Sequence, residues 1–131
     1  MKYSASLENR PGVHQVTLKV GDKEQSLPIP PRETGGSSLT GGELLFLALA
    51  TCYCNDIYRE ATARGIKVTG VEVKVEGDFE APRLPGTNIV YRARVTAEAS
   101  DEQIRELMLH TDTIAEVHNT LRVGTPVKLE I

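Results

Sequence analysis

The sequence contains two cysteines, Cys52 and Cys54, and both lie in residues 41–64, GGELLFLALATCYCNDIYREATAR. A cysteine thiolate is a nucleophile that can be oxidised reversibly, so these positions are the first candidates for chemistry. The stretch predicts the longest helix of the chain. Side chains two positions apart point about 200° apart on an α-helix, so the two thiols cannot form a disulfide within it. The two cysteines therefore belong to different faces of one helix.

Cys54 shares its face with residues that are nearly all apolar. They are Leu47, Ala50, Thr51, Ile57, Tyr58 and Ala61. This pattern predicts that Cys54 packs as a small buried hydrophobe. Residues 44–50 are apolar without interruption, which predicts that this half of the helix is covered on all sides.

Cys52 lies where its face changes from apolar to polar. Leu45, Ala48 and Leu49 precede it on that face, and Asn55, Asp56 and Arg59 follow it. A thiol at such a border can be both shielded and reachable, although free cysteines are usually buried and unreactive. Asp56, one turn on, would raise the pKa of the thiol, and Arg59 lies about 10 Å along the axis. A cation that activates Cys52 must therefore come from elsewhere in the chain.

The sequence predicts no metal site and no cofactor. The Cys-x-Cys pair diverges on a helix, and His14, His110 and His118 are isolated from one another. No glycine pair is followed by the Gly-Lys-Ser/Thr of a nucleotide-binding loop. A Ser nucleophile elbow is also absent.

Composition excludes several classes of partner. The net charge is −3 with acidic and basic residues mixed along the chain, which does not favour nucleic-acid binding. The longest apolar run, residues 44–50, is too short to span a bilayer, so no membrane partner is expected. The first residues, MKYSASLENRPG, do not resemble a signal peptide. We expect a cytoplasmic location.

The elements around the helix are predicted from periodicity. Residues 1–9 are weakly patterned, and residues 13–20 and 24–29 alternate as two strands joined by a turn. After the helix, residues 66–80 and 89–97 alternate as long antiparallel partners. A capping box at Ser100 opens a helix to His110, and an interruption at residues 111–113 leads to a short helix over 113–122. Residues 125–131 alternate as a last strand. The order predicts a single α+β domain over residues 1–131.

The central stretch resembles the OsmC/Ohr family of osmotically inducible and organic hydroperoxide resistance proteins. The resemblance rests on Gly35-Gly36, Thr40-Gly41-Gly42-Glu43-Leu44-Leu45, Ala50-Thr51-Cys52-Tyr53, Arg10-Pro11-Gly12 and Val117-His118-Asn119-Thr120-Leu121. It implies antiparallel sheets wrapped around a long central helix in an intertwined homodimer. It also implies thiol-dependent reduction of organic hydroperoxides, with Cys52 as the peroxidatic cysteine and Arg10 as its activating cation.

Two positions depart from the pattern of the family's peroxidases. The carboxylate that orients the arginine would fall on Gly42, and Glu43 is the nearest substitute. The resolving cysteine would fall near Ala115 and is absent, so an external thiol must act as reductant. These departures keep two alternatives open. One is a module that binds a small apolar or thiol-bearing ligand in the dimer groove, and the other is a dimer whose cysteines are both core residues.

Overall fold

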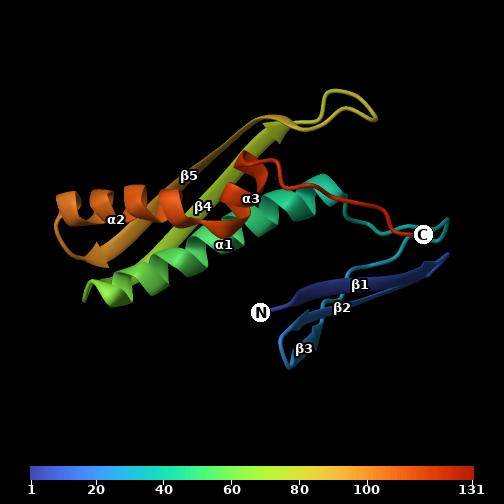
Figure 1. Ribbon diagram of the computed structural model, residues 1–131, viewed down its shortest axis with the longest axis horizontal. Coiled ribbons are helices and arrows are strands. Elements are labelled where there is room, and N and C mark those ends of the chain that lie inside the picture. The colour runs from blue at the N-terminus through green and yellow to red at the C-terminus, as the bar shows by residue number, and fades with distance from the viewer. The chain divides into compact units, whose positions relative to one another are not determined.

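The computed structural model describes all residues, 1–131, as an α+β protein with antiparallel sheets, which confirms the predicted class (Figure 1). The chain divides into two compact units, residues 1–44 and 45–131, and each is described by itself. The first unit holds a sheet in the order β1-β2-β3, and the second a sheet of β4 and β5 with three helices. The long helix α1 begins in the last residues of the first unit.

The first sheet contains β1 (Tyr3–Arg10), β2 (Val13–Val20) and β3 (Lys23–Ser26). Residues 3–10 form a strand despite their weak pattern, because β1 pairs with β2 along its whole length. The register places Leu7 opposite Val16, so the apolar residues of both strands share one face. The strand predicted over residues 24–29 ends instead at Ser26, and Pro28 has no N–H to donate to a ladder.

Helix α1 (Gly41–Ala63) begins at a capping box formed by Thr40 and Glu43. The Glu43 amide donates to Thr40 Oγ1 at 3.2 Å, and the Thr40 amide donates to Glu43 Oε1 at 3.0 Å. The helix ends at Ala63, and Gly65, two residues on, has a positive φ of 66°, as is typical of a residue after a helix. Although α1 has 23 residues, no helix of the protein is long and apolar enough to cross a membrane.

The second sheet is a long hairpin of β4 (Lys67–Asp78) and β5 (Thr87–Glu98). One face alternates through Val71 and Val73 and packs against the core, as predicted. The other face carries charges in opposite pairs, with Glu72 facing Arg94 across the strands. Two irregularities, between Val68 and Gly70 and between Glu76 and Asp78, interrupt the ladder.

Helices α2 (Asp101–Ile114) and α3 (Glu116–Arg122) follow the hairpin. The predicted capping box at Ser100 is present, with Gln103 as its second member. The predicted interruption at residues 111–113 is wrong, because α2 continues to Ile114 and the break falls at Ala115. The hydroxyls of Thr111 and Thr113 donate to carbonyls one turn back, at 2.7 and 2.6 Å, and so keep both threonines helical.

The core of the second unit joins α1, β5 and α2. Its buried members are Tyr53, Ile57, Ala61, Val95 and Leu107. The buried face of α1 is rotated around the helix axis relative to the predicted face. Cys54 is only half-buried, and Leu47 is 58% exposed. The expectation that residues 44–50 are covered on all sides is therefore wrong for the single chain, where only Leu49 among them is buried. Leu47 is exposed, and the other apolar residues of this run are partly buried.

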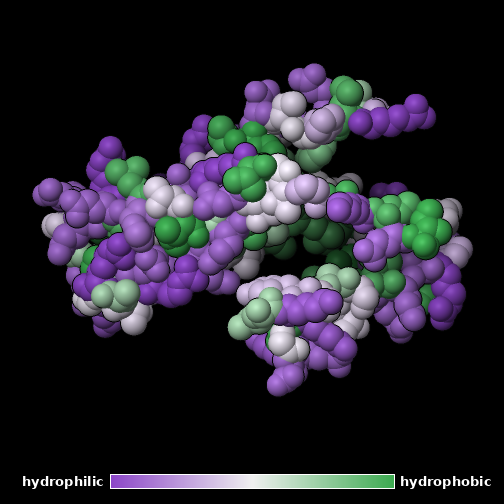
Figure 2. Space-filling model, in the orientation of Figure 1, coloured by the Kyte–Doolittle hydropathy of each residue, from purple (hydrophilic) through white to green (hydrophobic).

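Residues 125–131 do not form the predicted last strand. No strand of the chain pairs with them, and Val127, Leu129 and Ile131 are all almost fully exposed. An alternating segment forms a strand only where a sheet edge accepts its hydrogen bonds, which explains why the pattern alone did not suffice. Hydrophobic residues consequently reach the surface between hydrophilic ones (Figure 2).

Candidate functional site

Cys52 lies on α1 with its sulfur between two carboxylates. The thiol donates to Asp56 Oδ2 at 3.8 Å and to Glu116 Oε2 at 3.7 Å, distances suited to a weak sulfur donor. Asp56 is one turn further along α1, whereas Glu116 is the first residue of α3. Cys52 is a free cysteine and is half-buried. The site therefore joins two helices through Cys52 and Glu116, which are 64 residues apart in the sequence.

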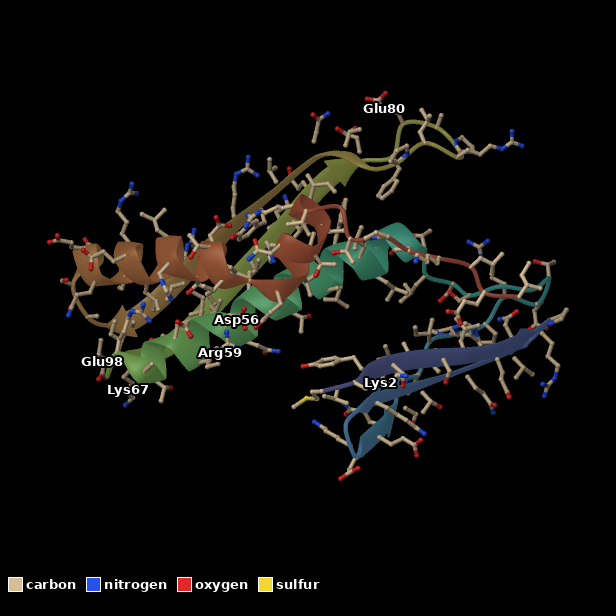
Figure 3. The ribbon with its side chains drawn as sticks, viewed as in Figure 1. Lys2, Asp56, Arg59, Lys67, Glu80 and Glu98 are labelled. Atoms are coloured by element: carbon tan, nitrogen blue, oxygen red, sulfur yellow. The ribbon has the colours of Figure 1, made fainter.

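Arg59 holds the two carboxylates together. Its Nη1 lies 3.1 Å from Asp56 Oδ1 and 3.6 Å from Glu116 Oε1. Each carboxylate thus uses one oxygen toward the guanidinium and the other toward the sulfur. The side chains of Asp56 and Arg59 project from the same part of α1 (Figure 3). Asp56 is 5% exposed and Glu116 is 66% exposed, so only Glu116 has broad access to solvent.

The electrostatic setting favours the protonated thiol. Burial is the main cause that raises the pKa of Cys52, and the charges of Asp56 and Glu116 raise it further. A hydrogen bond from the Val117 backbone N–H acts in the opposite direction. Burial and the nearby Glu116 also raise the pKa of Asp56, while Arg59 lowers it. The site therefore holds two carboxylates beside the thiol and a single cation, Arg59.

The position of Glu116 depends on how α3 is fixed to α2. Arg122 Nη1 donates to the Asp112 carbonyl at 2.9 Å, and its Nη2 lies 2.7 Å from Asp112 Oδ1. The Asn119 side chain donates to the Thr113 carbonyl at 2.9 Å. Ala115, between the two helices, is completely buried. These contacts fix the turn that presents Glu116 to Cys52.

A second polar cluster joins α3 to β5 and α2. The Tyr91 hydroxyl donates to Asp112, which also binds Arg122. His118 is 4% exposed, and its ring stacks edge-on against Tyr91 with centroids 4.7 Å apart. Neither ring nitrogen of His118 has a hydrogen-bond partner. Burial is the main cause that lowers the pKa of His118, so the imidazole is held in its neutral form.

Arg10 and Glu43, the other predicted site residues, both belong to the first unit. Arg10 ends β1, is exposed and makes no ion pair within the chain. Glu43 uses its Oε1 to accept hydrogen bonds from the Thr40 amide and hydroxyl, which lower the pKa of Glu43. The structure therefore gives Glu43 a helix-capping role. Catalytic roles for Arg10 and Glu43 stay predictions.

Sequence reasoning found Cys52 and the effect of Asp56 on it, but it did not identify Glu116. The helical spacing of Asp56 is a local signal, whereas Glu116 reaches the sulfur only through the packing of α3. The one available signal was the resemblance, which placed the missing resolving cysteine next to this residue, at Ala115. Arg59 forms ion pairs with Asp56 and Glu116, so it acts on Cys52 through these two carboxylates.

The ligand atoms of Cys52, Asp56 and Glu116 all lie within 4.8 Å of one another, which is close enough to share a metal ion. Thiolate and carboxylate donors could bind a borderline cation such as Zn²⁺. The guanidinium of Arg59 already pairs with both carboxylates and would repel a divalent ion. The geometry thus suits proton exchange better than metal binding.

Comparison with solved structures shows the same fold in several proteins. The OsmC-like protein from Mycoplasma pneumoniae has a TM-score of 0.66 at 19% identity, covering 93% of this chain and 88% of its own. An organic hydroperoxide resistance protein from Elizabethkingia anophelis gives 0.61 at 14% identity, with 93% and 89% covered. The organic hydroperoxide resistance protein OhrB of Bacillus subtilis gives 0.56 at 17% identity, with 99% and 97% covered.

Among curated proteins, no sequence matches this chain. The family model for the OsmC-like protein matches residues 34–130, which include all of α1 and the Cys52 site. The match covers well over half of the chain, and it agrees with the fold of the solved structures. The chain therefore belongs to the OsmC-like protein family.

Proposed function

We propose that this protein reduces organic hydroperoxides through Cys52, with an external small thiol or dithiol as reductant. The observation that carries the proposal is a free, half-buried thiol in contact with polar groups from two helices, within an OsmC-like chain. Structural neighbours named as organic hydroperoxide resistance proteins support the substrate class. The proposed activity is a defence against oxidative stress.

The proposed reaction uses a single cysteine of the chain, Cys52. The sulfur attacks the O–O bond, which gives an alcohol and a sulfenic acid on Cys52. Cys54 diverges from Cys52 on α1, and no cysteine stands at Ala115 or Glu116. An external thiol then attacks the sulfenic acid and releases water, and a second thiol frees Cys52 from the mixed disulfide.

Arg10 and Glu43 are the proposed assistants of Cys52. Arg10 is exposed and without an ion pair in the chain, so its guanidinium is free to stabilise a thiolate or a developing alkoxide. Glu43 engages Thr40 through Oε1 alone, which leaves Oε2 free to accept from a guanidinium. We expect Arg10→Met to slow oxidation of Cys52 by hydroperoxide, and Arg10→Lys to retain part of the rate.

We also propose that the active form is a homodimer. Three apolar surfaces support this assignment, namely the incompletely buried residues 44–50 of α1, the apolar face of the first sheet, and residues 125–131. A second copy offers both apolar area and free strand edges, and the alternating tail could add to such an edge. Sedimentation analysis should give twice the chain mass, and deletion of residues 125–131 should shift the protein toward monomer. A monomer at micromolar concentration would overturn the assignment.

Trapping of the sulfenic acid tests the proposed function. The purified protein is treated with tert-butyl hydroperoxide and then dimedone, and the label is mapped by mass spectrometry. We expect labelling of Cys52 that is lost in Cys52→Ser and kept in Cys54→Ser, together with turnover on addition of dithiothreitol. Absence of label at excess peroxide would exclude the peroxidase function.

One observation favours a second function. The raised pKa of Cys52 leaves most of the thiol protonated at neutral pH, which disfavours a peroxidatic cysteine. A chain without label in the trapping assay would then be a module that binds a small apolar or thiol-bearing ligand. Thermal shift with such ligands, in the wild type and in Cys52→Ser, separates this function from an inert core cysteine.

A further inference from the structure

We propose that Glu116 is the proton-transfer residue of Cys52, carrying the thiol proton to the alcohol product. This inference rests on the proposed hydroperoxide reduction and adds a catalytic residue to it. It derives from the position of one carboxylate oxygen, Glu116 Oε2, 3.7 Å from the sulfur. The position next to it, Ala115, is where the resemblance places a second cysteine, so this chain presents a carboxylate to Cys52 instead of a thiol.

The geometry separates the roles of the two carboxylates. Asp56 is 5% exposed and is bound by Arg59 at 3.1 Å, so it has little access to a leaving group that arrives from solvent. Glu116 is 66% exposed and lies further from Arg59, at 3.6 Å. An exposed acid that contacts both the sulfur and solvent can receive a proton from one and deliver it to the other.

The proton-transfer step balances without another reactant. The thiol proton moves to Glu116 Oε2 as the sulfur attacks the terminal, hydrogen-bearing oxygen of the hydroperoxide. The S–O bond forms, the O–O bond breaks, and its electron pair leaves with the alkoxide. Glu116 then passes the proton to the alkoxide, so that Cys–SH and ROOH become Cys–SOH and ROH. The sulfur is oxidised, the peroxide is reduced, and the carboxylate is regenerated.

All charged groups that face the sulfur are part of this account. Asp56 contacts it from α1 and Glu116 from α3, Arg59 pairs with both carboxylates, and the Val117 N–H donates to the sulfur. Loss of the Glu116 charge should lower the pKa of Cys52 and increase the fraction of thiolate at neutral pH. Glu116→Gln should therefore accelerate a reaction of the thiolate whose leaving group needs no proton. It should slow a reaction whose leaving group must be protonated.

The experiment compares two reagents on the same thiol. Second-order rates of Cys52 with iodoacetamide and with tert-butyl hydroperoxide are measured from pH 5 to 9 in a Cys54→Ser background. Iodide leaves without a proton, whereas the alkoxide requires one. For Glu116→Gln we expect alkylation at pH 7 to become several-fold faster and peroxide reduction to become at least about tenfold slower, within the range of general acid–base catalysis.

Glu60→Gln is the matched control. Glu60 also contacts Arg59, at 3.4 Å, but it has no contact with Cys52. We expect it to leave both rates within about twofold of the parent, because it lies outside the proton path. Glu116→Asp should recover part of the peroxide rate, since it keeps the carboxylate.

The outcomes distinguish the inference from the proposed function. A parent protein whose Cys52 is alkylated but never oxidised by hydroperoxide overturns both. A parent that is oxidised, with Glu116→Gln oxidised equally fast or faster, overturns the proton transfer and keeps the peroxidase. Opposite changes in the two rates support the assignment, because a structural or purely electrostatic role would move both in one direction.

Discussion

His118 offers a direct measurement of how the second unit responds to pH. The ring is 4% exposed with both nitrogens unpaired, and burial lowers its pKa below the ordinary value of 6.5. The unfolded chain therefore takes up a proton near pH 6.5 that the folded protein resists. Stability from this residue is complete above pH 6.5 and falls as pH decreases toward the folded pKa. One proton limits the slope to about 1.4 kcal/mol per pH unit.

Replacement of His118 by Phe tests this reasoning. The Phe ring can keep the edge-on contact with Tyr91 and removes two buried unpaired polar atoms. A buried polar group without a partner costs about 1–3 kcal/mol, so we expect His118→Phe to raise the free energy of unfolding at pH 7.5 by about 1–2 kcal/mol. The gain should be larger at pH 5.5, where the wild type has lost the stability of its neutral imidazole.

Urea unfolding monitored by circular dichroism at fixed protein concentration, at pH 5.5 and 7.5, measures both effects. His14→Gln is the control, because His14 lies in the first sheet and the pKa argument does not involve it. The pH slope that His118 contributes should remain in His14→Gln and be lost in His118→Phe. Lower stability of His118→Phe at pH 7.5, with an unchanged pH slope, would refute the account and imply that the imidazole is satisfied in the native protein.

Three further substitutions test the packing that positions the site. Gly77→Ala would place a Cβ 2.8 Å from the Phe46 ring, so we expect a loss of about 1–3 kcal/mol in urea unfolding. Leu107→Ala should cost about 2–5 kcal/mol in the same assay, because this completely buried side chain joins α2 to α1. Ser100→Ala removes the hydroxyl that accepts from the Gln103 amide and should lower the thermal midpoint in calorimetry, at a cost of about 1 kcal/mol. A loss from Ser100→Ala as large as that from Leu107→Ala would contradict the capping assignment.

Local patterns predicted the elements whose hydrogen bonds are local or lie in adjacent strands. The long helix, the β4–β5 hairpin and the Ser100 capping box all follow from short-range signals. The patterns failed where a distant partner decides the outcome. β1 has little character of its own and exists through its pairing with β2, whereas residues 125–131 alternate but lack a strand to pair with.

The candidate site shows the same division. Cys52 and Asp56 are one turn apart, so their contact could be anticipated from helical spacing. Glu116 meets them only because Arg122 and Asp112 fix α3 to α2. Roles for Arg10 and Glu43 in this site stay predictions, because both residues belong to the first unit.

The two irregularities in the β4–β5 ladder have a consequence for aggregation. A hairpin with twelve-residue strands exposes long outer edges, and such edges can template pairing with other chains. A bulge bends the strand and breaks the even spacing of its free amides and carbonyls, and here one lies toward each end of β4. The straight stretch left between them carries Glu72, Lys74 and Glu76 on its outer face, so an incoming strand would have to match alternating charges. The edge of β4 is thereby a poor template for fibre-like association with other chains.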